Sequence, residues 1–201
     1  MSDVESFVRF CDSEFGSAVM DREAAYVRRH VAADDRALDV GCGIGSLEER
    51  VPDRDMTGLD LSAAMVRTAR DRVDAPFVLG DATALPVATG SVDAVVFVST
   101  LEFLPDAEAA LSEATRVLAS DGTLVALVLN TRSEYVRSNL RREGSYFRRM
   151  VHRDSAALTE TVLERVDGER EYFLGISGEE VFESDDPETA AIAAVVGEPV
   201  D

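Results

Sequence analysis

The length, composition and charge of the chain exclude several classes of protein. Its 201 residues, 46% of them hydrophobic, suffice for one folded domain with a buried core and argue against disorder. The chain has 39 acidic and 20 basic residues, and the net charge of -19 argues against nucleic-acid binding, which needs a basic surface. No stretch reaches the roughly 18 to 20 apolar residues of a membrane span.

The kind of charge is also informative. Every basic residue is an arginine, and the acids are scattered along the chain. We expect such a surface in a halophilic protein of a very salty cytoplasm, where screening relieves self-repulsion. The acidic N-terminus does not resemble a signal peptide, and two cysteines, Cys11 and Cys42, are too few for a disulfide framework. We therefore expect a cytoplasmic protein with reduced thiols and no metal site.

The first 33 residues indicate a helical segment with an aromatic start. Residues 17–31 place apolar side chains among charged ones with helical spacing. Phe7, Phe10 and Phe15 come before this helix in a lead-in that we expect to be flexible. They could simply cover a sheet edge, or they could form a lid over a ligand.

A buried strand followed by a glycine-rich turn organises the rest of the chain. Residues 37–45 read Ala-Leu-Asp-Val-Gly-Cys-Gly-Ile-Gly, with glycines at alternate positions. Glycine adopts positive φ angles and lets a ligand approach the backbone amides. A helix starting near Ser46 would point its positive end at that ligand. The alternative is an ordinary tight turn.

A second strand over residues 56–59 ends at Asp60. A carboxylate at this strand tip can accept two hydrogen bonds from a ribose diol, which favours a nucleotide-type ligand. An ordinary strand-end turn would also explain an acid here. Ser62 can cap a following helix over residues 63–73.

Strands and helices continue to alternate through residue 129. We expect strands over residues 76–79, 91–99 and 123–129 and a helix over residues 106–118. The second of these strands is almost continuously apolar, which is typical of a strand covered on both faces. The alternation predicts an α/β protein with a doubly wound, mostly parallel Rossmann-like sheet.

Residues 131–153 interrupt this pattern with a basic, aromatic segment. Its arginines either neutralise the acidic surroundings or form an anion-binding cap over the substrate; they are Arg132, Arg137, Arg141, Arg142, Arg148, Arg149 and Arg153. A last helix over residues 155–165 follows. Closing strands are expected over residues 171–174, 180–182 and 190–196.

One domain with four parts is therefore expected. These parts are a helical lid, a cofactor-binding core, a basic substrate cap, and a closing helix with strands, at residues 1–33, 34–130, 131–153 and 154–201.

The ordered motifs resemble the class I S-adenosylmethionine-dependent methyltransferases, among them the small-molecule type that includes quinone-biosynthesis C-methyltransferases. The matching segments lie between residues 36 and 130: 38–45, 58–62 with Met65, 80–82, 85–86, 91–93, 104–105, 116–118 and 121–122. The resemblance implies a Rossmann-like fold closed by a C-terminal antiparallel strand pair. It also implies S-adenosyl-L-methionine as cofactor and methyl transfer to a small-molecule acceptor by in-line displacement.

The resemblance further implies where the cofactor would bind. The turn after the first strand would hold its methionine end, Asp60 both ribose hydroxyls, and Leu61 the adenine face. Asp81 would accept from the adenine amino group, and Ser99 would line the methyl-donor site. The implied cofactor-binding residues are Asp39, Gly41, Cys42, Gly43, Gly45, Asp60, Leu61, Met65, Asp81, Ala82 and Ser99.

Departures from related patterns keep alternatives open. Ser46 stands where a dinucleotide fingerprint has glycine, so an NAD(P)-dependent oxidoreductase is the weaker interpretation. After Ser99 the chain lacks the Asn/Asp-Pro-Pro-aromatic run of amino-nitrogen methyltransferases, and it has no Pro-Cys nucleophile. These absences argue against adenine, glutamine-amide and cytosine-carbon substrates.

The catalytic base is not assigned, because residues 100–103 lack the histidines that many relatives carry there. Candidates are Glu102, Tyr135, Tyr146 and His152. Without an obvious base, a non-catalytic cofactor-binding partner or regulatory protein is a further alternative. We expect a monomer or homodimer whose acceptor is anionic if the arginine-rich segment binds it.

Overall fold

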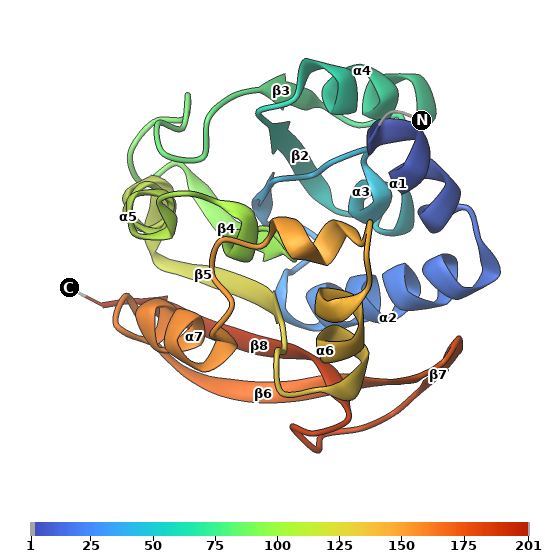
Figure 1. The fold of residues 1–201 in the computed structure, drawn as a ribbon. Coiled ribbons are helices and arrows are strands. Elements are labelled where there is room, and N and C mark those ends of the chain that lie inside the picture. Colours follow the sequence, from blue (N-terminus) through green and yellow to red (C-terminus); the bar gives the residue numbers. More distant parts are fainter. Residues whose placement is uncertain (1–2, 201) are drawn as a thin grey trace.

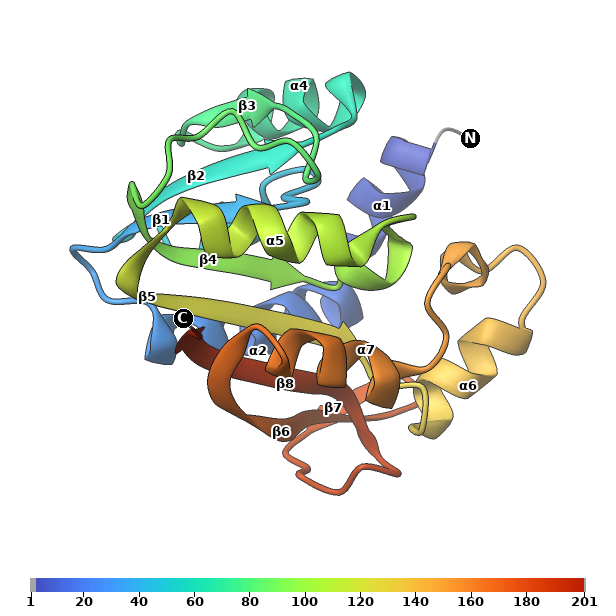
Figure 2. The same ribbon diagram turned by 90° about the vertical axis from the view of Figure 1, so that its left-hand side faces the viewer.

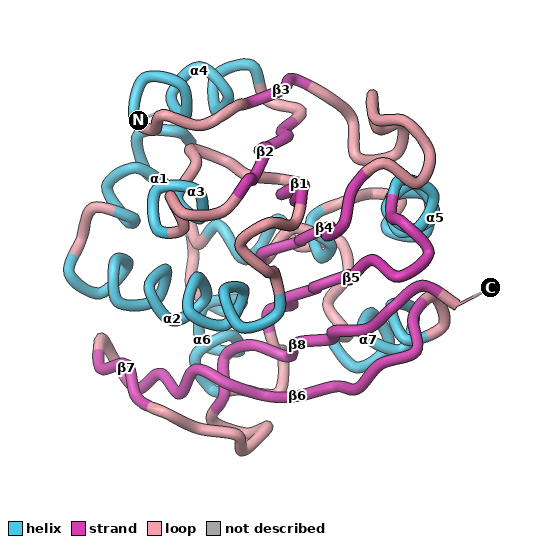
Figure 3. Tube along the Cα trace, turned by 180° about the vertical axis from the view of Figure 1, so that it is seen from behind, coloured by secondary structure: helices cyan, strands magenta, loops and turns pink. Residues whose placement is uncertain are grey.

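One eight-stranded sheet forms the centre of the molecule in the computed structural model, which describes residues 3–200 (Figure 1). The strand order is β3-β2-β1-β4-β5-β8-β6-β7, which Figure 3 shows side by side. The parallel strands are β1 (Arg36–Val40), β2 (Asp55–Asp60), β3 (Phe77–Leu79), β4 (Val92–Val98) and β5 (Leu118–Leu129). The antiparallel strands are β6 (Val166–Ser177), β7 (Glu180–Phe182) and β8 (Ala190–Pro199). The predicted Rossmann-like fold with antiparallel C-terminal strands is confirmed.

Helices cover both faces of this sheet. α2 (Glu14–His30) packs on one face, whereas α5 (Ala107–Val117) and α7 (Ser155–Leu163) pack on the other (Figure 2). Along β5, Val125 and Leu127 join the core on the α2 side, and Leu124 and Ala126 join the core on the α5 side. Residues 94–98 of β4 and 124–129 of β5 are all apolar because both faces of the sheet are covered here. None of the described helices is both long and apolar enough to cross a membrane.

The N-terminal segment is more helical than the sequence predicts. α1 (Asp3–Cys11) carries Phe7 and Phe10, which therefore lie on a helix and not in a flexible lead-in. α2 begins at Glu14, where the Ser13 hydroxyl accepts from the Gly16 amide at 3.0 Å. A Cβ on Gly16 would stand 1.9 Å from the Phe10 carbonyl oxygen, so glycine is required where the two helices meet.

Several other boundaries agree with expectation to within a few residues. α3 (Ser46–Arg50) and α4 (Ala63–Arg72) follow β1 and β2, and the Ser62 side chain caps α4 as predicted. β5 starts at Leu118 instead of residue 123, so residues 118–122 also belong to the strand. The pairing register with β4 shifts at this point, which accommodates the polar residues.

The segment between β5 and α7 contains structure that the sequence did not predict. It forms α6 (Glu134–Arg141) and the 3₁₀ helix η2 (Tyr146–Arg149), while η1 (Leu101–Phe103) follows β4. α7 ends at Leu163, two residues before the expected end. β6 is longer than predicted because it pairs with β8 along most of its length.

Candidate functional site

A cavity of about 440 Å³ lies at the carboxyl ends of the parallel strands. Its wall is formed by α1 and α2, the turns after β1 to β4, and the aromatic residues of α6 and η2. Figure 2 shows α1 and α6 at the end of the sheet to which β4 and β5 point. Ligands of open α/β sheets bind at this edge. All the predicted cofactor-binding residues except Gly45 line the cavity.

The glycine turn after β1 gains its shape from bonds within the protein. The amides of Gly41 and Cys42 both donate to the Leu59 carbonyl, at 2.7 and 3.0 Å, and the Gly43 amide donates to Asp60 at 3.0 Å. These amides are therefore not spare donors for a ligand. The glycines instead provide clearance: Gly41 has φ +86°, and a Cβ there would stand 2.3 Å from Thr100 Cγ2.

Gly45 has a different role from the other two glycines of the turn. It caps α3 with φ +79°, and a Cβ would stand 2.8 Å from the ring of Phe77. It therefore allows close packing of α3 against β3 and does not face the cavity. α3 has only five residues, so its aligned peptide dipoles contribute less than the sequence suggested.

Asp39 is a buried acid at the base of the turn. Only 2% of its surface is exposed, and Oδ1 has no hydrogen-bond partner among residues 3–200. Burial, with the charges of Glu48 and Asp60, raises the pKa of Asp39 well above its ordinary value. A buried carboxyl beside a cavity is stabilised by a cation, so this position fits the ammonium group at the methionine end of the cofactor.

Asp60 stands at the tip of β2. Its Oδ2 accepts from the Gly43 amide at 3.0 Å, and its Oδ1 accepts from the Ser62 amide at 2.7 Å. Burial raises the pKa of Asp60, and these two amides oppose the rise. Because each carboxylate oxygen has two lone pairs, Asp60 retains the capacity to accept from a ribose diol while it holds the turn in place.

The adenine end of the site is more open. Asp81 is exposed, and its Oδ1 accepts from the Thr83 amide and hydroxyl at 2.9 and 2.8 Å. These bonds lower the pKa of Asp81 and keep it ionised. Leu61 lines the cavity, and 71% of its surface is exposed. Its side chain is therefore accessible for packing against a flat apolar group. Met65 of α4 and the buried Ala82 also line this end.

Backbone strain is concentrated on the cavity wall. Among residues 3–200, the two non-glycine residues with positive φ are Ser99, at +48°, and Leu174, at +72°, and both line the cavity. The Ser99 amide donates to the Leu127 carbonyl at 2.8 Å, while its buried hydroxyl has no partner in the described chain. Such strain is retained where function needs a particular geometry.

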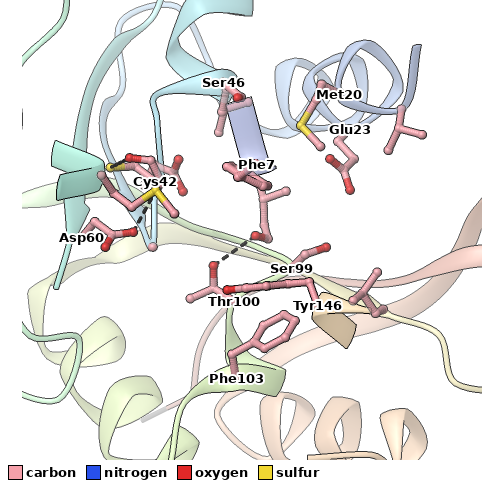
Figure 4. A pocket seen from close by; sticks show the side chains of 18 of the residues that line it. Phe7, Met20, Glu23, Cys42, Ser46, Asp60, Ser99, Thr100, Phe103 and Tyr146 are labelled. Carbon is pink, nitrogen blue, oxygen red and sulfur yellow. Dashed lines mark hydrogen bonds between the residues drawn. The ribbon is translucent and has the colours of Figure 1, made fainter. Parts of the chain in front are cut away.

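Much of the cavity wall is apolar and aromatic. Phe7, Phe103 and Met20 contribute to it (Figure 4), as do side chains of the arginine-rich segment, namely Tyr135, Tyr146 and Phe147. None of the arginines of residues 131–153 lines the cavity. Arg132 pairs with Glu188 and Arg141 with Glu134, each at 2.8 Å.

The four candidate bases differ in whether they reach the cavity. Tyr135 and Tyr146 line the cavity, whereas Glu102 and His152 do not. Glu102 is fully buried, and its Oε1 accepts from the Leu129 amide at 2.9 Å, which ties η1 to β5. A ring nitrogen of His152 lies 3.0 Å from the Leu104 carbonyl oxygen.

Glu23 is a cavity residue that sequence reasoning missed. It lies on α2 with its carboxyl in the cavity wall (Figure 4), and only 4% of it is exposed. The signal was present, because Glu23 is four residues after Val19 and four before Val27, both buried. An acid in phase with the apolar face of a helix marks either a buried ion pair or a ligand site.

The sheet order and the site together define a class I methyltransferase fold. A glycine turn, a buried acid below it and a second acid on the neighbouring strand tip meet at the carboxyl edge of the sheet. Residues 38–126, fewer than half of the chain, match the family model described as a methyltransferase domain. The matching family and fold imply S-adenosyl-L-methionine as the cofactor of this domain.

Individual proteins support this assignment. The demethylmenaquinone methyltransferase of Thermus thermophilus is 35% identical over 122 residues, which cover 56% of each chain. A SAM-dependent methyltransferase structure from Thermotoga maritima, described as a possible histamine N-methyltransferase, has a TM-score of 0.79 and 22% identity. The alignment covers 98% of this chain and 95% of that one.

A third similar structure is described as the complex between the Haloferax volcanii Trm112 methyltransferase activator and "the putative methyltransferase". Its TM-score is 0.71 at 22% identity, with 100% of this chain and 99% of that chain covered. The structural likenesses are below 25% identity and establish the fold. The chain spans about half or less of the length of the curated relatives it matches.

Proposed function

We propose that this chain is an S-adenosylmethionine-dependent methyltransferase that acts on a small-molecule acceptor. One observation carries the proposal: Asp39, Asp60 and Asp81 converge on one cavity whose opposite side is apolar and aromatic. The acids suit the ammonium, ribose and adenine groups of the cofactor. The aromatic side suits an organic acceptor and would exclude water from the reaction.

The proposed reaction is an in-line displacement. When bound, S-adenosylmethionine would supply a methyl group activated by its positively charged sulfur, for in-line displacement by the acceptor atom. Asp39 and Asp60 would fix the amino-acid end and the ribose of the donor, and the strained Ser99 would border the methyl group. Proximity and orientation of this kind can supply roughly 7 to 11 kcal/mol of the barrier reduction.

Calorimetry with S-adenosylmethionine and its demethylated product in molar KCl tests the proposal. We expect both to bind, whereas NAD(P)-dependent chemistry would require nicotinamide binding instead. Incubation of a metabolite extract with methyl-labelled cofactor then separates an enzyme from a non-catalytic binding protein. Transfer of label to a small molecule supports the enzyme.

Asp60→Ala is the sharpest variant for the cofactor site. Cofactor affinity should fall at least about tenfold, because the variant removes two ribose hydrogen bonds and the anchor of the Gly43 amide. The matched control is Asp55→Ala, at the other, exposed end of the same strand. Equal affinity of Asp60→Ala and the wild-type protein would exclude the assignment.

We also propose that the chain binds a methyltransferase activator protein. Full-length similarity to the activator-bound Haloferax volcanii protein favours this role. β3 is an edge strand whose Val78 and Leu79 residues are 37% and 54% exposed, and such edges accept a further strand.

Co-purification with the Haloferax volcanii activator tests this surface. It should be lost in Leu79→Asp and retained in the control Val151→Asp, which alters another exposed apolar side chain. Retention in Leu79→Asp would exclude this surface.

A further inference from the structure

Glu23 is an acid of the cavity that has no role in the cofactor site as proposed. Its Oε2 is buried and has no hydrogen-bond partner in the described part of the chain. The carboxyl lies beside Met20 and faces the cavity (Figure 4). A buried polar group without a partner costs free energy, and a buried charge without one costs more. A ligand group that pairs with Glu23 would remove this cost.

Glu23 belongs to the acceptor side of the cavity. In Figure 4 it stands across the cavity from Asp60, with Ser99 and Thr100 between them. The lining on its side includes Met20, Tyr135 and Phe147. A molecule in this space would therefore meet one carboxyl in otherwise apolar surroundings.

The charge of the cavity favours a cation. Its lining contains Glu23 and three aspartates but no Arg, Lys or His among residues 3–200. The negative charge of Glu102 on η1 raises the pKa of Glu23, and the positive charge of Arg50 on α3 lowers it. The Arg50 guanidinium is already held by Asp21, Ser17 and the Ser46 carbonyl, at 2.7, 3.1 and 3.0 Å.

We propose that Glu23 binds the amino group of the methyl acceptor, and that this acceptor is an apolar molecule with a basic amine. The inference rests on the proposed function, because it assigns the acceptor end of the same cavity. The ammonium would pair with the unpartnered Oε2, and the hydrocarbon part would contact Met20, Tyr135 and Phe147. The arginines, which suggested an anionic acceptor, lie outside this lining.

Binding of an amine at this position should also displace a proton. Burial, together with the charge of Glu102 and against that of Arg50, raises the pKa of Glu23 to about 8. The empty carboxyl is then largely protonated at pH 7, and an arriving ammonium favours its ionised form. The other titratable groups acting with Glu23 are Asp39 of β1 and Tyr135 of α6, whose pKa burial raises to about 12.

Calorimetry on the protein saturated with S-adenosylhomocysteine tests the inference. The probes are three matched pairs: hexylamine and hexanol, 2-phenylethylamine and 2-phenylethanol, tryptamine and tryptophol. In molar KCl at pH 7, at least one amine should bind about tenfold or more tightly than its alcohol. Comparing buffers of different ionisation enthalpy should show proton release with that amine and not with the alcohol.

The Glu23→Gln variant completes the test because it keeps the side-chain shape and removes the charge. It should lose the preference for the amine and the proton release, with S-adenosylhomocysteine affinity unchanged; the control Glu179→Gln, in the exposed turn after β6, should keep both. No amine preference in any pair of the wild-type protein, including no binding at all, overturns the inference even if the variant does not fold. Retained preference in Glu23→Gln overturns it as well. Absence of S-adenosylhomocysteine binding would instead contradict the proposed function.

Discussion

At the scale of single residues, the shape of the site depends on glycines, which leave space because they have no side chain. Gly41 is the clearest case, since it combines φ +86° with a neighbour, Thr100, in the space that a Cβ would occupy. Gly178 also has a positive φ, of +62°, but nothing lies within 4 Å of its missing Cβ. Comparing substitutions at Gly41 and Gly178 therefore separates the free-energy cost of the backbone conformation from that of the overlap with Thr100.

Gly41→Ala should therefore be more destabilising than Gly178→Ala. In both variants the left-handed backbone conformation lowers the free energy of unfolding by about 1–2 kcal/mol. Only in Gly41→Ala does the new Cβ also overlap with Thr100. Thr100→Ala introduced into Gly41→Ala should recover part of the loss, because Cγ2 and Oγ1 are then gone. Denaturant unfolding of the single and double variants in molar KCl measures this coupling. Equal losses at Gly41 and Gly178 would show that the wall yields to the added methyl group.

At the scale of elements, α6 and η2 supply aromatic side chains to the cavity and direct their arginines elsewhere. Phe147 packs edge-to-face on Tyr135 with ring centroids 5.8 Å apart, and both line the cavity. Arg141 instead pairs with Glu134 of the same helix. The segment therefore has the position of a cap, with an apolar and not a basic inner surface.

Phe147→Ala should weaken binding of the preferred amine probe several-fold, because it removes apolar contact area from the acceptor side. The double charge reversal Arg141→Glu with Arg142→Glu should leave that affinity and S-adenosylhomocysteine affinity within about twofold, since neither arginine lines the cavity. Calorimetry with the same probes compares the two. Loss of amine binding in the charge-reversal variant would return the arginines to the acceptor site.

At the scale of the whole molecule, the net charge of -19 opposes folding at low salt. The midpoint of thermal unfolding should rise by several degrees from low salt to molar KCl, where the Debye length shrinks to about 3 Å. A variant with Glu143→Gln, Glu164→Gln and Glu179→Gln, all at exposed positions, should be more stable than wild type at low salt and less dependent on KCl. A midpoint independent of KCl in both proteins would show that self-repulsion is negligible.

Local patterns in the sequence were sufficient to predict the central sheet of the molecule. The glycines after β1, the acid at the tip of β2 and the alternation of strands with helices predicted the sheet and the residues that meet at its edge. These predictions succeed because a parallel sheet brings all of its strand ends to one side, so an acid near a strand end is placed by topology. The helical lead-in and α6 were missed because their packing against distant segments, and not local pattern, stabilises them.

The sequence by itself determined the fold class and the acid-bearing turn, since both rest on short-range pattern and strand order, and the resemblance of its motifs to a known family implied the cofactor. Only the tertiary structure decided what faces the acceptor. Glu23 on α2, Tyr135 on α6 and Leu174 on β6 come from segments far apart in the chain, and their meeting depends on how the helices and the antiparallel strands pack. The direction of a side chain on a packed helix depends on its neighbours in space, so arginines that looked like a binding surface lie outside the cavity and a buried glutamate lies within it.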